Sequence, residues 1–130
     1  SGDATVLHVH FNQVTLSGSG DFAIRLGVGG AATATGYVSG ASAAGGGTSI
    51  SDGMIVKAGT AGTTYSGVMM CTRRSATNIW VCTHSVGGSA IGDSSFGGGV
   101  VTLSGELGMF QIHAVSGSFD GGSISGRYWR

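Results

Sequence analysis

The sequence predicts an all-β fold, namely an antiparallel β-sandwich, jelly-roll-like, of about eight or nine short strands. Glycine makes up 27 of the 130 residues, and proline is absent. The glycines separate short runs rich in Val, Ile, Phe, Tyr and Thr, which is typical of strands joined by tight turns. Because no helical pattern is strong enough to connect parallel strands, the strands are expected to pair antiparallel.

Each expected strand is a run of apolar and β-branched residues that ends at a Gly, Ser or Asn turn. In chain order the strands are residues 6–16, 21–26, 35–39, 49–57, 65–74, 78–84, 100–104, 109–115 and 123–128. Only residues 91–96 have any helical character, and their Gly and Ser content argues against a helix. With no linker or repeat between these runs, residues 1–130 are expected to form one domain.

Charge is scarce in this sequence. Six basic and six acidic residues balance, and charged residues are 9% of the chain, against about a quarter in an average soluble domain. So little charge gives no long-range attraction for nucleic acid or for an anionic membrane surface, and neither is expected as a partner. No apolar run approaches the roughly 18 residues that a membrane helix needs.

The first strand alternates between two kinds of side chain. Leu7, Val9 and Phe11 are expected to face the core, whereas His8 and His10 share the opposite face with Val6 and Asn12. A His-x-His pair on one strand face can chelate zinc, but no adjacent Asp, Glu or Cys completes a ligand set. A surface or subunit contact is therefore the preferred interpretation, and no metal or other cofactor is expected. The remaining alternatives are that the fold brings the other histidines close, or that copies stack one histidine around a threefold axis.

Cys71 and Cys82 flank an expected hairpin. A two-residue turn within the run Ser75-Ala76-Thr77-Asn78 places the cysteines directly opposite each other and Arg73 opposite Trp80. In that register the cysteines form a hydrogen-bonded pair with Cα atoms about 5.5 Å apart, where a disulfide is feasible but not favoured. Buried free thiols are therefore expected.

No catalytic pattern stands out. The serines lie in Gly-Ser turns rather than in a Gly-x-Ser-x-Gly elbow. The acids Asp52, Asp93, Glu106 and Asp120 have no spacing that selects a catalytic pair. The run Gly27-Val28-Gly29-Gly30 lacks the Lys-Ser or Lys-Thr of a phosphate-binding loop. The chain is not expected to be an enzyme.

A series of short motifs runs along nearly the whole chain. They are the long first strand, then Phe22-Ala23-Ile24-Arg25-Leu26-Gly27, Gly29-Gly30, Thr35-Gly36-Tyr37-Val38-Ser39, Asn78-Ile79-Trp80-Val81 and the closing Gly-Ser-Ile strand. This order resembles a family of bacteriophage virion structural proteins. His8, His10 and the aromatic tail Tyr128-Trp129-Arg130 depart from that family's pattern.

The resemblance implies a jelly-roll-like domain that forms homotrimers and is displayed on the virion, with other capsid or tail proteins and a host-surface receptor or glycan as further partners. It also implies assembly in a reducing bacterial cytoplasm, which agrees with free thiols. The expected function is that of a non-enzymatic surface-appendage domain of tail-fibre or spike type. A capsid decoration protein is the alternative, and a free carbohydrate-binding module is the third.

The C-terminal strand is expected to pair with the first long strand, with Ile124 and Tyr128 facing the core or a neighbouring subunit. The residues expected at subunit contacts are His8, His10, Tyr128 and Trp129.

Overall fold

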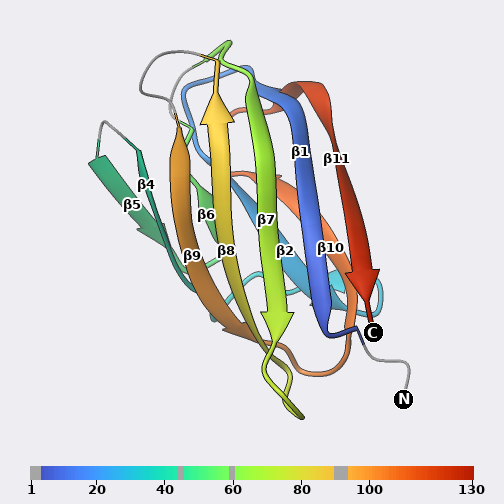
Figure 1. The fold of residues 1–130 in the computed structure, drawn as a ribbon. Helices are drawn as coiled ribbons and strands as arrows, with labels where there is room; N and C mark the ends of the chain where they lie inside the picture. Colours follow the sequence, from blue (N-terminus) through green and yellow to red (C-terminus); the bar gives the residue numbers. More distant parts are fainter. Residues whose placement is uncertain (1–3, 44–45, 59–60, 90–93) are drawn as a thin grey trace.

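The computed structural model describes residues 4–43, 46–58, 61–89 and 94–130. It confirms the predicted antiparallel β-sandwich, and the described residues include no helix (Figure 1). Eleven strands are present: β1 (Val6–Leu16), β2 (Phe22–Val28), β3 (Ala31–Ala32), β4 (Val38–Ala43), β5 (Gly46–Ile50), β6 (Met54–Val56), β7 (Tyr65–Arg73), β8 (Ile79–Gly88), β9 (Ser95–Thr102), β10 (Leu107–Ala114) and β11 (Phe119–Trp129).

The two sheets differ in size. The larger is seven-stranded, in the order β11-β1-β7-β8-β9-β4-β5. The smaller has the order β10-β2-β3, with β6 also paired to β2. Figure 1 shows β2, β6 and β10 behind the larger sheet, so that one face of each sheet is turned toward the other.

The core lies between the sheets and follows the alternation of β1. Leu7, Val9 and Phe11 are buried, as predicted, and they belong to one cluster with Phe22 and Ile24 of β2. The rings of Phe11 and Phe22 meet edge to face with centroids 5.5 Å apart, a favoured geometry for aromatic pairs. Burial of one face of β1 therefore holds the two sheets together.

A β-bulge interrupts β1 near its end. Gln13 has a φ of 52°, and the register of β1 shifts there against both β7 and β11. The Gln13 backbone N–H donates to the Ser66 hydroxyl at 3.0 Å, so a side chain replaces the missing ladder partner. On β11 the bulge faces Gly122, which has a φ of 86°. A Cβ there would approach the Gln13 carbonyl oxygen, so this position favours glycine for both reasons.

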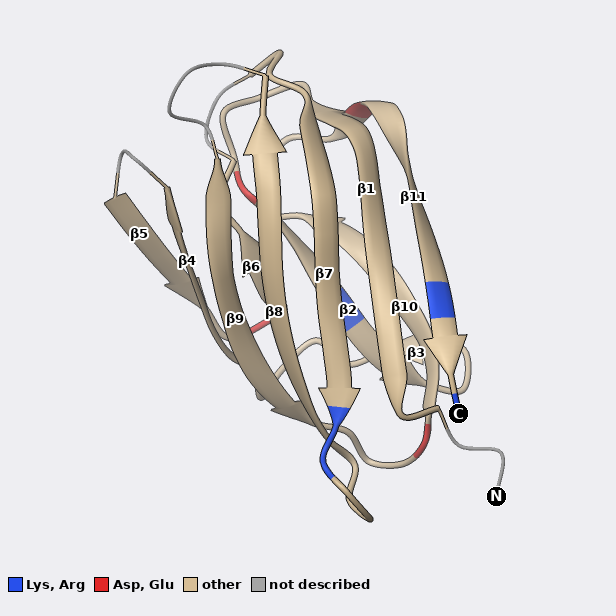
Figure 2. Ribbon diagram, in the orientation of Figure 1, with Lys and Arg blue, Asp and Glu red and all other residues tan. Residues whose placement is uncertain are grey.

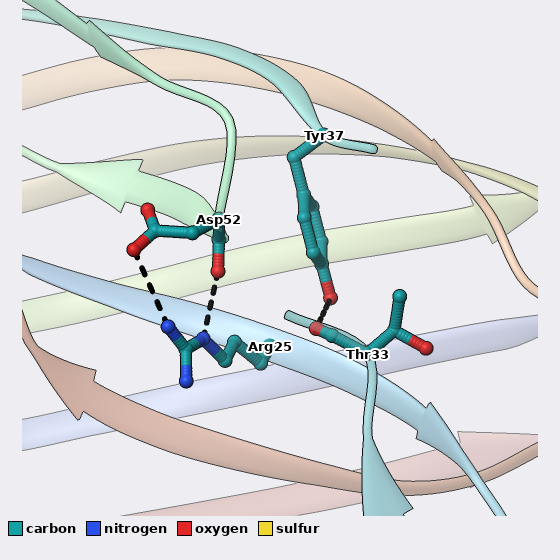
Figure 3. A network of polar contacts seen from close by, with 4 residues as sticks. All are labelled: Arg25, Thr33, Tyr37 and Asp52. Carbon is teal, nitrogen blue, oxygen red and sulfur yellow. Dashed lines mark hydrogen bonds and ion pairs between the residues drawn. The ribbon is translucent and has the colours of Figure 1, made fainter. Parts of the chain in front are cut away.

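Polar side chains fasten the segment that follows β2 (Figure 3). The buried Tyr37 hydroxyl accepts from the Leu26 N–H at 2.9 Å and donates to the Thr33 carbonyl at 2.8 Å. Burial raises the pKa of Tyr37, so its hydroxyl keeps its proton. Arg25 donates through Nε to the Asp52 carbonyl at 2.7 Å and reaches the Asp52 carboxylate at 3.3 Å. These bonds fix the path of the chain from β2 to β6.

Only the strand expected at residues 6–16 has the predicted limits. The other expected strands differ by up to five residues at an end, β3 was not expected, and three of the differences have a clear cause. Residues 49–57 form two strands, β5 and β6, because the chain turns at residues 51–53. The expected strand 35–39 begins later, as β4 at Val38, and continues to Ala43, four residues beyond its expected end. The strand expected at 100–104 is β9 and begins at Ser95, because Gly97, Gly98 and Gly99 pair in the ladder although they carry no apolar pattern.

The closing strand pairs with the first, as predicted. β11 runs antiparallel to β1 from the Val6–Trp129 pair to the Leu16–Phe119 pair. Its inward Ile124 packs against the core. Because β11 is an edge strand, its pairing to β1 is the only strand ladder that holds it in the described fold.

Deletion of residues 123–130 is expected to abolish soluble expression. The deletion removes most of β11, leaving the β1 backbone as an unpaired edge and the core near Ile124 open to water. Deletion of Arg130 alone, which follows β11, is the matched control and is expected to leave the fold intact. Solubility and protease resistance measure both, and a soluble, protease-resistant 1–122 chain would contradict the role given to β11.

Candidate functional site

The side chains of the seven-stranded sheet that point away from the smaller sheet form the outer face. The strand register places His8 beside Met70 of β7 and His10 beside Val68, with Thr83 and Ser85 of β8 next along the same two rows. The apolar members of the outer face are Val6, Val38, Val68, Met70, Ile79, Val81, Phe96, Val100 and Trp129.

Large apolar side chains on the outer face are unusually exposed. The exposed fractions are 77% for Val38, 64% for Phe96, 45% for Met70, and 39% for both Val100 and Trp129. Single exposed apolar residues are common on protein surfaces, whereas several gathered on one face indicate a contact surface.

Charged groups are nearly absent from this face. Among the described residues of the seven-stranded sheet, Figure 2 shows Arg or Lys only on β11 and at the β7–β8 hairpin, whereas another lies on β2 of the smaller sheet. Arg127 lies near the C-terminal end of β11, and Asp120 lies near the opposite end of that strand. At the Gly40–Gly98 pair the face carries no side chains. The result is a broad and nearly neutral surface.

His8 and His10 lie on the outer face, as alternation predicts. The His8 ring packs on the Trp129 indole with centroids 4.4 Å apart, and the two imidazole centroids are 6.3 Å apart. Arg127 is the cross-strand partner of His8, and its fixed positive charge disfavours a metal cation here. His84 lies between the sheets and His113 lies on β10, so the four histidines do not converge. No cluster of three metal-ligating side chains occurs within the described ranges.

Tyr128 lies apart from the other three expected contact residues. It is opposite Leu7 in the ladder, on the inward side of β11, and its ring centroid is 6.4 Å from that of Phe110. Tyr128 therefore shares the inward side of β11 with Ile124, as expected, and points away from the face that carries Trp129. Phe96 and Val38 lie on the outer face but were not among the contact residues expected from the sequence. Correct limits for β4 and β9 would have placed both on the outer face by the same alternation.

The structure pairs Cys71 with Cys82 and Arg73 with Trp80, as predicted, but the expectation of free thiols is wrong. Cys71 and Cys82 form a disulfide, with Cα atoms 4.0 Å apart. The reason is the hairpin loop. The Arg74 N–H donates to the Ile79 carbonyl at 2.9 Å, so residues 75–78 form a four-residue loop and the ladder parity shifts by one. The cysteines then form a non-hydrogen-bonded pair, whose side chains lie closer together.

A buried Ser–His pair lies between the sheets. The Ser95 hydroxyl and His84 Nε2 are 2.9 Å apart, and the hydroxyl also accepts from the Lys57 N–H at 3.1 Å. The two residues are 2% and 6% exposed, so this serine does not meet substrate from solvent. His84 Nδ1 has no hydrogen-bond partner in the part of the chain that the structure describes, and hence no carboxylate there orients the ring. The alternation of Trp80, Cys82 and His84 in the sequence would have predicted this burial.

The acids considered for catalysis do not form a pair among the described residues. Asp52 binds Arg25, and Asp120 accepts from the Thr15 hydroxyl at 2.5 Å. Asp93 lies outside the described residues. The residues that are described therefore leave the outer face as the best candidate site.

Comparisons of this chain with protein-family models, with curated proteins and with solved structures find no match. Within the described ranges, no helix has the length and apolar character to cross a membrane.

Loss of the disulfide is expected to lower the free energy of unfolding. A cross-link between residues 11 apart removes chain entropy from the unfolded state, worth about 3 kcal/mol at this loop length. The double variant Cys71→Ala/Cys82→Ala should show this loss in denaturant titrations and should be insensitive to reductant. Reductant added to the unsubstituted chain in the same titration should reproduce the loss, and an unchanged midpoint there would contradict the disulfide.

Burial of His84 is expected to make stability depend on pH. Desolvation lowers the pKa of His84 from 6.5 to about 4. The unfolded chain therefore binds a proton below pH 6.5 that the folded chain does not bind until about pH 4. The free energy of unfolding should fall by about 3 kcal/mol across that window as the pH is lowered. His84→Gln, which keeps a hydrogen-bonding group beside Ser95 but cannot titrate, should lose this slope in denaturation series at fixed pH. The same slope in His84→Gln would assign it to another group.

Proposed function

We propose that this chain is a non-enzymatic structural protein that assembles with further copies of itself through the outer face. The setting that we propose is a homotrimeric surface-appendage domain of a bacteriophage virion, of tail-fibre or spike type. The observation that carries the contact is the gathering of Val38, Phe96, Met70, Val100 and Trp129 on one nearly neutral sheet face. The virion setting is supported by the sequence resemblance alone.

A second copy is the occupant that best fits the charge of the outer face. A charged surface repels its own copy and requires a partner of opposite sign, whereas a neutral apolar surface meets its copy without repulsion. Arg127 lies at the β11 margin, where it can remain in water when the centre of the face is covered.

The two halves of the outer face differ, which favours a ring. The β11–β1 half carries Trp129, His8 and His10, whereas the β9–β4 half carries Val38, Phe96 and Val100. When one half of a surface contacts the other half of the next copy, the contact is heterologous, and a rotation that closes gives a cyclic oligomer. A homotrimer is the smallest such ring.

Capsid decoration is the second candidate, and the breadth of the same face favours it. A decoration protein needs a wide apolar base that covers capsid subunits, and six strands of the sheet contribute the apolar members of the outer face. In that case the occupant is another virion protein, and the purified chain remains monomeric. A carbohydrate-binding module has less support, because Trp129 and Phe96 are separated by four strand spacings, about 19 Å.

The unsubstituted chain is expected to sediment as a trimer at micromolar concentration, and Val38→Thr/Phe96→Ser is expected to dissociate. Burial of one large apolar side chain contributes about 1.5–3 kcal/mol, so the double variant should weaken association by at least about tenfold. Sedimentation equilibrium measures the mass and the association constant.

Val115→Thr is the matched control, because Val115 is also exposed, at 45%, but follows β10 of the other sheet. It should remain trimeric. A monomeric unsubstituted chain would overturn the proposed self-assembly and leave capsid decoration as the better candidate.

A further inference from the structure

The sandwich has an apolar cavity on the side where β10 and β11 form the edges of their sheets. Its volume is about 230 Å³. The lining residues are Val14, Ile112, Phe119, Gly121, Gly122, Ser123 and Ile124. The cavity is distinct from the outer face, because Ile112, Phe119 and Ile124 pack against the core between the sheets.

Two glycines explain why the chain leaves this space open. A Cβ at Gly121 would lie 2.8 Å from Thr15 Oγ1, and a Cβ at Gly122 would collide with the Gln13 carbonyl group. Contact with β1 therefore disfavours a side chain at both positions, and the stretch of β11 beside the cavity carries none at residues 121 and 122. β10 and β11 do not pair with each other, so the cavity also opens toward solvent between them.

The chemistry of the walls selects an uncharged ligand. None of the lining residues is charged. Four of the seven have apolar side chains, and Ser123 has the only polar side chain among them. The nearest acid in sequence is Asp120, between two lining residues, and its negative charge disfavours an anion at this end.

The size of the cavity sets the size of the ligand. An apolar protein cavity of about 150 Å³ stays dry and binds benzene, which has six carbons. This cavity, of about 230 Å³ and open to solvent on one side, holds in proportion at most about nine carbons. We propose that this cavity is a binding site for a small neutral apolar molecule of that size. The proposal is independent of the proposed self-assembly.

The test uses two probes with the same carbon skeleton. Neutral 3-phenylpropan-1-ol and the anion 3-phenylpropanoate are titrated into the isotope-labelled full chain and followed by NMR. The alcohol is expected to bind at least about tenfold more tightly than the anion, because the walls offer the carboxylate no partner. Intermolecular NOEs from its ring protons should reach the methyl groups of Val14, Ile112 and Ile124. Absence of alcohol binding, or NOEs to other parts of the chain, overturns the proposal.

A substitution that fills the cavity gives the second arm. Ile112→Phe adds side-chain volume to the wall and should weaken alcohol binding at least about tenfold, since little space remains. Val115→Phe is the matched control, because it also introduces a phenylalanine but lies just beyond the end of β10. This variant should bind the alcohol as tightly as the unsubstituted chain does. Because Ile112→Phe can disturb packing, Ile112→Ala is measured beside it and should retain binding. Unchanged affinity in a folded Ile112→Phe chain overturns the proposal.

The assembly state provides the last arm. The alcohol should bind equally to the unsubstituted chain and to Val38→Thr/Phe96→Ser, whose substitutions lie on the outer face. Binding only by the double variant would mean that a second copy occupies the cavity in the assembled protein, and it would overturn the proposal.

Discussion

The rest of the structure depends on the double pairing of β1. This strand is hydrogen-bonded to β11 along one side and to β7 along the other. It therefore joins β11 to the middle of the larger sheet. Its inward side chains bury the core, and its outward ones begin the outer face. A slip of one residue would exchange these two sets. The bulge at Gln13 opposes such a slip, because both neighbouring strands are matched to it.

Alternation made part of the fold predictable from the sequence. Strands β1, β7 and β8 carry a clear period of two, and the sequence places them closely because one face of each is buried. β9 lacks that signal. Its Gly97 lies so close to the neighbouring strand that a Cβ would meet the Gly40 carbonyl oxygen. The same tight packing that requires glycine there removes the apolar pattern by which a strand is recognised.

The candidate site was predictable to the same extent. His8 and His10 follow from the alternation along β1, whose limits were predicted correctly. Trp129 lies one residue beyond the expected end of the closing strand, and Val38 and Phe96 lie on strands whose limits depend on sheet pairing. The bond between Cys71 and Cys82 depended on a finer detail. That Cys71 lies opposite Cys82 follows from the centre of the hairpin. Whether the two form a hydrogen-bonded or a non-hydrogen-bonded pair depends on the length of the loop at residues 75–78, which sequence alone does not fix.

The position of that bond has a consequence for its chemistry. Cys71 and Cys82 are 0% and 1% exposed, within a ladder that continues on both sides of them. Thiol–disulfide exchange requires a thiolate to reach one of the sulfur atoms, and here that access requires local opening of the β7–β8 hairpin. The rate at which the bond is made or broken is therefore limited by hairpin opening rather than by the strength of the reductant. A folded molecule moved between compartments would keep the redox state in which it folded for as long as that hairpin stays closed.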